Sequence, residues 1–335
     1  MAQLIKLQDY ISRYQIDITR YPTQYVRLKR TQWEKVKQQW LTGEEPIIWK
    51  HIEEEEEQPK RFSFIKKWLH KKRMEEEEDI ESVDVSHEAM EDREEHFEAE
   101  STLSFEPNIV YQPDNLEDLK RMFLDQFFHF QLKWASSTLL EKSYIDPRFY
   151  RDGFLRTVLQ RLPDNYLVFY YPIIKIKKAP VELDVIILTP TECLCITLVE
   201  QEEDAVYIGD GDRFWTKKIG KRNEKILNPI IQLNRMDAIV SQLFKNHQAD
   251  FPIRKILLSR TGYFAQSMSL FNVQLVDKRG YTEWLQQLKY SPSPIKKKQI
   301  EAAQAILSNV DTTSYSRAIW QASNQEPERE DNIRQ

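Results

Sequence analysis

The feature that most constrains the fold is a pair of apolar segments, 181–187 and 193–200, which have the length of β-strands. The residues between them, Leu188–Glu192, include a proline and two threonines, so the pattern predicts a buried β-hairpin. Asp184 lies inside the first strand, where a carboxylate without a partner would be costly to desolvate. We therefore interpret Asp184 either as a strand-edge residue with a backbone partner or as a residue retained for chemistry.

Composition limits the class of protein. With 335 residues and 41% hydrophobic content, the chain suits one sizeable domain with appendages or two small domains. Residues 44–100 hold 21 acidic and nine basic side chains, so the net charge of −5 leaves +7 on the remainder. A basic remainder is compatible with nucleic acid as a partner.

The two cysteines and the lack of long apolar runs predict a reducing compartment. Cys193 and Cys195 lie two positions apart on one strand, which places them on the same face and unsuited to a mutual disulfide. The sequence shows neither a membrane-spanning apolar run nor a charged leader followed by an apolar stretch. We therefore expect a cytoplasmic protein without a transmembrane segment.

The chain divides into four expected parts. Residues 1–42 form an N-terminal helical segment, and residues 43–104 form an acidic, largely disordered linker. Within the linker, residues 61–73 have the pattern of a basic amphipathic helix, which could neutralise the flanking glutamates or contact a protein partner, nucleic acid or an anionic membrane. The folded domain is expected over 105–322, and a disordered tail over 323–335.

Periodicity predicts the elements within these parts. In the N-terminal segment, Leu4, Leu7, Tyr10 and Ile11 predict a first helix, and a second follows Pro22 as far as Trp40. Further helices are predicted at 115–140, 148–162, 229–246, 281–289 and 296–309. Strands are predicted at 166–176, 181–188, 192–199, 254–259 and 273–276, with a further hairpin around Gly209 to Gly211.

Several weak motifs occur in an order that resembles a known family. They are Arg151-Asp152, Glu182-Leu183-Asp184 and Asn228-Pro229 with Gln232. In order and spacing, residues 149–288 resemble the nuclease-related domain (NERD), a branch of the PD-(D/E)xK restriction-endonuclease-like superfamily. The resemblance implies an α/β fold, with a mixed sheet flanked by helices. It also places the family's Glu-x-Lys pair at Thr197 and Val199, which carry neither residue.

The resemblance implies a metal-dependent nuclease site that is degenerate here. In such a site carboxylates hold Mg²⁺ against the phosphate and a lysine orients the attacking water. Asp184 and Asp152 are the candidate metal ligands, and Glu182 and Gln232 are further candidate site residues. A bulge could bring in Glu200 or Glu202, and the lysine could be replaced by Lys175 or Lys177. We expect no cofactor unless catalysis survives, in which case Mg²⁺ is implied.

A basic stretch follows the predicted strands and is a candidate for binding nucleic acid. Its residues are Arg213, Trp215, Lys217, Lys218, Lys221 and Arg222. The simpler interpretation is an exposed loop with a hydrophobic anchor. Three functions therefore stay open: an inactive nuclease-related module that binds nucleic acid or protein, a Mg²⁺-dependent nuclease with an unorthodox site, and a membrane-surface or complex-assembly protein.

Overall fold

The computed structural model describes residues 1–42, 105, 107, 113–138, 141–176, 179–200, 202–209, 212–265, 272–290 and 293–313. The predicted linker over 43–104, its basic segment 61–73 and the predicted tail over 323–335 lie outside these residues. In the described part of the chain, no helix is long and apolar enough to cross a membrane.

A six-stranded mixed sheet forms the centre of the fold. Its spatial order is β1 (Gln3–Leu7), β2 (Leu167–Tyr170), β5 (Val185–Leu188), β6 (Cys193–Leu198), β10 (Ile253–Leu258) and β12 (Val273–Val276). The pairs β2–β5 and β5–β6 are antiparallel, whereas β1–β2, β6–β10 and β10–β12 are parallel. All residues of β1, β2 and β5 are buried, so both faces of the sheet are covered there.

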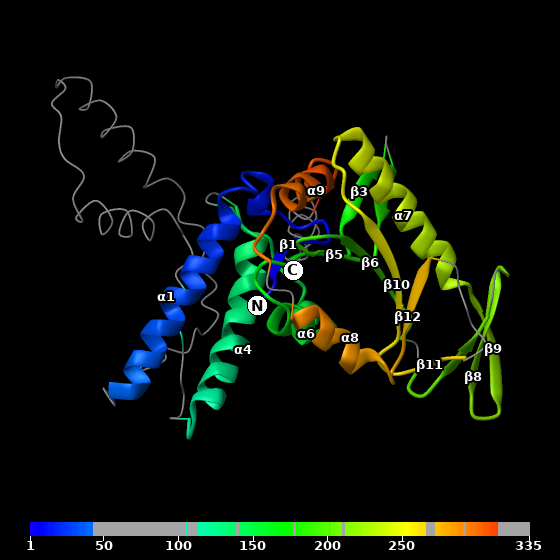
Figure 1. Ribbon diagram of the computed structural model, residues 1–335, viewed down its shortest axis with the longest axis horizontal. Helices are drawn as coiled ribbons and strands as arrows, with labels where there is room; N and C mark the ends of the chain where they lie inside the picture. Colours follow the sequence, from blue (N-terminus) through cyan, green and yellow to red (C-terminus); the bar gives the residue numbers. More distant parts are fainter. Residues whose placement is uncertain are drawn as a thin grey trace, which may run out of the picture.

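Helices cover the sheet. The helix α7 (Pro229–Asn246) packs on β6 and β10 and contacts α9 (Lys297–Leu307), which lies against β5. At the β1 edge, α4 (Leu116–Ala135) contacts β1 and α6 (Gly153–Arg161), and α1 (Tyr21–Thr42) lies beside α4 (Figure 1). The remaining helical segments are η1 (Arg13–Gln15), α5 (Pro147–Arg151) and α8 (Tyr281–Lys289). A mixed sheet flanked by helices confirms the expected fold class.

The N-terminus corrects one prediction. The expected first helix is wrong, because residues 3–7 form the edge strand β1 in parallel pairing with β2. The apolar residues Leu4 and Leu7 suit a helix and a fully buried strand equally well, and pairing with β2 decides between them. The expected second helix is α1, and Pro22 lies in its first turn, where proline is tolerated.

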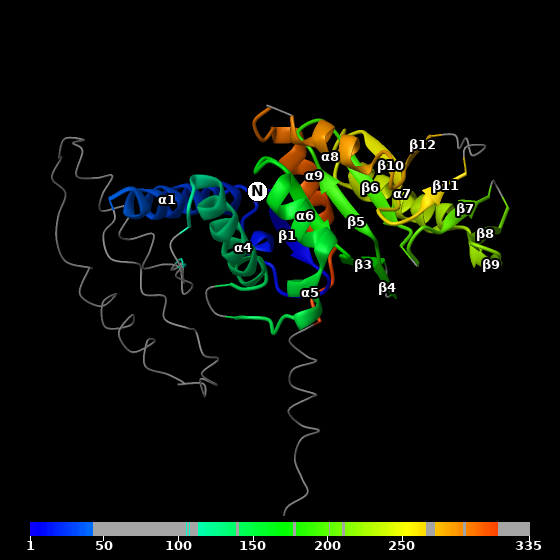
Figure 2. The same cartoon turned by 90° about the horizontal axis from the view of Figure 1, so that it is seen from below.

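Two smaller sheets extend from the main one. The first pairs β3 (Ile173–Ile176) with β4 (Ala179–Glu182). The second has the order β11 (Tyr263–Phe264), β7 (Val206–Ile208), β8 (Phe214–Ile219) and β9 (Arg222–Leu227). The β8–β9 hairpin lies at the end of the molecule opposite α1 (Figures 1 and 2). The predicted basic loop is therefore wrong in form, because most of it belongs to this hairpin.

Candidate functional site

Asp184 lies at a bend in a long hairpin. The strands predicted over 166–176 and 181–188 are each interrupted, the first at Tyr171 and the second at Leu183 and Asp184. Tyr171 has a φ of 49°, a left-handed value that costs energy for a residue with a side chain. The Leu183 amide donates to the Pro172 carbonyl oxygen at 3.0 Å, so the two interruptions face each other. The bend releases Asp184 from the strand ladder immediately before β5.

Two neutral side chains donate hydrogen bonds to the Asp184 carboxylate. Thr197 Oγ1, on β6, donates to one carboxylate oxygen at 2.6 Å, and Gln232 Nε2, on α7, donates to the other at 2.6 Å. Gln232 lies in the first turn of α7, which Asn228 caps by accepting a bond from the Ile230 amide at 2.9 Å. Residues from three separate motif positions thus meet. We call Asp184, Thr197 and Gln232 the aspartate cluster.

The electrostatics of the aspartate cluster follow from burial. Asp184 is only 7% exposed, and burial raises the pKa of its carboxyl, while the bonds from Thr197 and Gln232 act in the opposite direction. A glutamate in place of Thr197 would set a second carboxylate against Asp184, an arrangement that a cation or a shared proton would have to stabilise. The threonine hydroxyl instead donates to the aspartate. Val199 is 4% exposed and belongs to the hydrophobic core.

Asp152 has a structural role at a helix terminus. The predicted helix over 148–162 is divided at this residue into α5 and α6, and Asp152 caps α6. One carboxylate oxygen accepts from the amides of Phe154 at 2.9 Å and Leu155 at 3.0 Å. The other accepts from the Tyr170 hydroxyl at 2.6 Å. Burial and the neighbouring Asp152 charge raise the pKa of Tyr170, so this hydroxyl stays a proton donor.

A carboxylate and an arginine pair where β6 and β10 end. Glu200 accepts two bonds from the Arg260 guanidinium, at 2.5 and 2.6 Å, and one from the Arg260 amide at 3.0 Å. The same guanidinium lies over the Phe154 ring, 5.2 Å from its centroid. Glu200 is therefore committed to an ion pair. Arg260 was missed in the sequence, because its proximity depends on the parallel pairing of β6 with β10.

Tyr171 is half-buried near several of the candidate carboxylates, and its pKa responds to them. Its pKa is raised to about 12, first by burial and then by the charges of four surrounding residues. These are Asp184, Asp152, Glu200 and Glu182. Glu182 is exposed at the end of β4. Among the residues that the structure describes, no three His, Cys, Asp or Glu side chains gather as a set that could hold a metal ion.

The donor set therefore does not fit Mg²⁺. Both oxygens of Asp184 and both oxygens of Asp152 accept hydrogen bonds from neutral groups. The other candidates for this site are paired elsewhere, exposed, or outside the described residues. Glu202 pairs with Lys217 at 3.0 Å, Lys175 is exposed on β3, and Lys177 lies outside the described residues.

The predicted nucleic-acid-binding residues divide into two groups. Trp215 is 1% exposed and packs so closely on Gly209 that no side chain fits at that position, so Trp215 is a buried anchor and is not accessible to nucleic acid. Lys217 is 5% exposed and pairs with Glu202 and Glu224, and Arg222 also pairs with Glu224. The other three predicted residues, Arg213, Lys218 and Lys221, are exposed.

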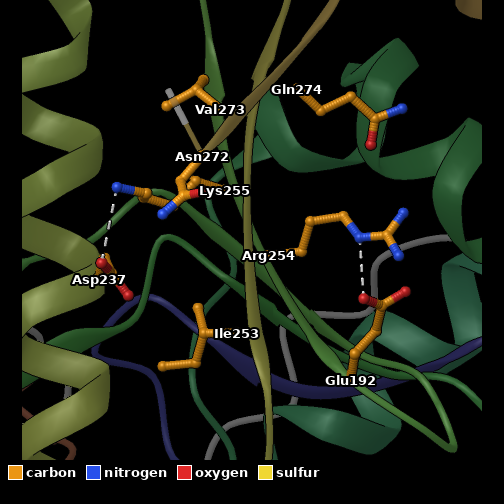
Figure 3. A pocket seen from close by; sticks show the side chains of 8 residues that line it. All are labelled: Glu192, Asp237, Ile253, Arg254, Lys255, Asn272, Val273 and Gln274. Atoms are coloured by element: carbon orange, nitrogen blue, oxygen red, sulfur yellow. Dashed lines mark ion pairs between the residues drawn. The ribbon is translucent and has the colours of Figure 1, made fainter. Parts of the chain in front are cut away.

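A surface pocket lies at the opposite end of the strands from the aspartate cluster. It is lined by Glu192, Asp237, Ile253, Arg254, Lys255, Asn272, Val273 and Gln274 (Figure 3). Arg254 and Lys255 extend to opposite sides of β10 in this view. Arg254 pairs with Glu192 at 2.9 Å and Lys255 with Asp237 at 3.8 Å. Because its cations are paired within the pocket, this site lacks the positive charge that a phosphate would require.

Comparison with known proteins gives one family and one short relative. Residues 152–259 match the family described as the nuclease-related domain. A stretch of 40 residues is 52% identical to a protein named RNA 2′,3′-cyclic phosphodiesterase from Geobacillus stearothermophilus. That stretch covers 12% of this chain and 13% of the length of that protein. No solved structure matches the chain.

Proposed function

Because residues 152–259 belong to the nuclease-related domain family, we propose that the protein is a nuclease-related module that binds nucleic acid without cleaving it. The observation that carries this proposal is the aspartate cluster. Two neutral donors hold Asp184 at 2.6 Å, so its burial is compensated without a metal ion. The family's lysine position is occupied by Val199, which is buried in the core and offers no group to position a water.

The charge distribution supports a polyanionic partner. Outside residues 44–100 the chain carries a net charge of +7, and Arg213, Lys218 and Lys221 are exposed on the β8–β9 hairpin or beside it. Exposed cations of this kind contribute to affinity by displacing counterions from phosphates. We therefore favour nucleic acid over a protein partner, whose recognition would not require an excess of cations.

The inactive site is tested by a cleavage assay. Purified protein is incubated with circular and linear DNA, and with RNA, in Mg²⁺ or Mn²⁺, beside the Asp184→Asn variant. We expect no cleavage above a buffer control from either protein. Cleavage by the wild type that Asp184→Asn abolishes would contradict the proposal, because it would show that the carboxylate takes part in chemistry.

The binding arm is tested separately. We expect the wild type to shift labelled DNA or RNA on a gel at about 50 mM salt, with an affinity that falls steeply as salt rises. An unshifted probe at that ionic strength would contradict the proposal that the protein binds nucleic acid. A protein partner would then become the favoured ligand of an inactive module.

A metal-dependent nuclease with an unorthodox site is the second candidate. The observation in its favour is that the Asp184 carboxylate is buried between β6 and α7, where it accepts bonds from both elements. Isothermal titration with Mg²⁺ and Mn²⁺ distinguishes it, because this candidate requires saturable binding that Asp184→Asn removes. The third candidate, a membrane-surface or complex-assembly protein, depends on residues 61–73, which lie outside the described part of the chain.

A further inference from the structure

The small sheet containing β7, β8 and β9 has two chemically different faces. Side chains alternate between the faces of a strand, and directly paired residues share a face. Trp215 and Tyr207 point to one face, where both are buried. We call the opposite face the outer face and define it by Ile208, Phe214, Lys218, Lys225 and Leu227.

Large apolar side chains are exposed on the outer face. Phe214 is 53% exposed and Leu227 is 57% exposed, and the two residues are direct partners across the β8–β9 pair. Ile208, on the neighbouring strand, is 40% exposed. The Arg213 guanidinium lies 5.6 Å from the centre of the Phe214 ring. A group of exposed apolar side chains on one surface is typical of a binding site.

Cations flank these apolar side chains. Lys218 lies opposite Asn223 and Lys225 lies opposite Thr216, so the two lysines are diagonal neighbours, about 7 Å apart by the geometry of paired strands. Both lysines are exposed, and neither forms an ion pair with any residue of the described chain. The acidic residue of β9, Glu224, points to the inner face, where it pairs with Lys217.

Resting on the proposed function, we propose that the outer face is the binding surface and that its ligand is single-stranded nucleic acid. Lys218 and Lys225 contact phosphates, and the Phe214 ring, with Leu227 and Ile208 beside it, stacks on an unpaired base. A duplex offers mainly phosphates to a flat surface, because its bases are paired and stacked inside. The exposed apolar side chains of the outer face can therefore contact bases only where the strand is unpaired. A second copy of this chain is a poorer fit, since the same unpaired lysines would oppose each other.

Fluorescence anisotropy with a labelled oligothymidylate and a duplex of the same length tests the proposal. Phe214→Ala removes the stacking surface, so we expect about tenfold weaker binding of the single strand with the salt dependence and duplex binding unchanged. The double variant Lys218→Glu, Lys225→Glu should weaken binding of both probes and reduce the salt slope by up to about two. The matched control is Lys35→Glu, Lys289→Glu, which reverses two other exposed lysines.

The outcomes separate the two proposals. If the wild type binds neither probe, nucleic-acid binding fails and the outer face fails with it. The wild type could bind while Phe214→Ala and the double variant Lys218→Glu, Lys225→Glu behave like the control. That result would contradict only the proposal that the outer face is the binding surface. Equal binding of duplex and single strand, with Phe214→Ala unchanged, would contradict the single-stranded ligand. A wild-type dimer in sedimentation that Phe214→Ala dissociates would assign the face to contacts between copies and overturn the proposal. Circular dichroism and thermal melting verify that each variant is folded.

Discussion

At the scale of residues, Thr197 changes what Asp184 requires of its surroundings. A buried carboxylate needs a cation or hydrogen-bond donors to offset its lost hydration. Thr197 and Gln232 each donate one bond at 2.6 Å, so the requirement is met by neutral groups. The same position occupied by glutamate would add a second negative charge. With threonine at position 197, Asp184 is the one carboxylate of the aspartate cluster.

This view predicts how stability depends on pH at Asp184. Burial raises the pKa of the folded carboxyl above its ordinary value of 3.8, so the unfolded chain loses this proton at a lower pH than the folded protein does. As pH rises above that value, the group lowers the wild-type free energy of unfolding. Asp184→Asn has no proton to lose, and its amide can still bond with Thr197 and Gln232. We expect the variant to gain stability relative to wild type between about pH 4 and pH 7.

Urea unfolding of the variant and the wild type at about pH 4 and at about pH 7 measures this difference in stability. Asp114→Asn, at an exposed aspartate, is the control for loss of one negative charge. A stability difference between Asp184→Asn and wild type that is the same at both pH values would contradict the argument.

At the scale of elements, the β8–β9 hairpin depends on its turn. Gly220 and Lys221 separate β8 from β9, and Gly220 has a φ of +55° with no atom within 4 Å of an added Cβ. The position therefore favours glycine for its backbone conformation alone. Two-residue hairpin turns with glycine first match the right-handed twist of the flanking strands. The sequence contains this glycine signal, but the charged residues around it do not give the alternating pattern that would predict β9.

Substitutions at Gly220 test this conformational requirement. We expect Gly220→Ala to lower the free energy of unfolding by about 1 kcal/mol, because alanine resists the left-handed region. Gly220→Asn should cost clearly less, since asparagine enters that region more readily. Denaturant titration detects the change globally, because the buried Trp215 couples the hairpin to the core. Equal losses for alanine and asparagine would show that φ is not the cause.

At the scale of the whole molecule, the two ends of the described chain meet at one edge of the sheet. Lys6, on β1, is fully buried, and its Nζ donates to Thr312 Oγ1 at 2.8 Å across 306 residues of sequence. Nζ also donates to the Tyr10 carbonyl oxygen at 2.5 Å. Burial lowers the pKa of Lys6 to about 7, although the charges of Asp9 and Asp311 raise it. The fold therefore holds a lysine that is easily deprotonated.

A pH dependence with the opposite sign to that of Asp184 follows. Between about pH 7 and pH 10.5 the unfolded chain retains the Lys6 proton and the folded protein has lost it, so this group raises the free energy of unfolding as pH rises. We expect Lys6→Met to lack this contribution. Urea unfolding of the variant and wild type at about pH 7 and pH 9 measures it. The wild-type free energy of unfolding should rise relative to that of Lys6→Met between these pH values. No such rise would contradict the assignment.

Sequence alone determined the elements with strong local signals. The β5–β6 hairpin, α7 after Asn228-Pro229, and the strands β10 and β12 occur where periodicity and capping place them. Local patterns succeed there because the residues that decide the element are neighbours in the chain. The resemblance to the nuclease-related domain, rather than local periodicity, makes Asp184 and Gln232 candidate site residues, and in the structure Gln232 Nε2 donates to Asp184 at 2.6 Å.

Which side chains lie together, by contrast, depends on pairing between distant parts of the chain. The parallel pairing of β6 with β10 brings Arg260 to Glu200, and the bend at Tyr171 releases Asp184 from the strand ladder. Neither follows from local pattern, because strand partners are chosen by packing over long separations in the sequence. Burial likewise took Trp215 away from solvent and left Phe214 exposed, although both lie on the same strand. Which face of a strand meets the core is a property of the whole fold, and here it leaves Phe214 and Leu227 on the exposed face.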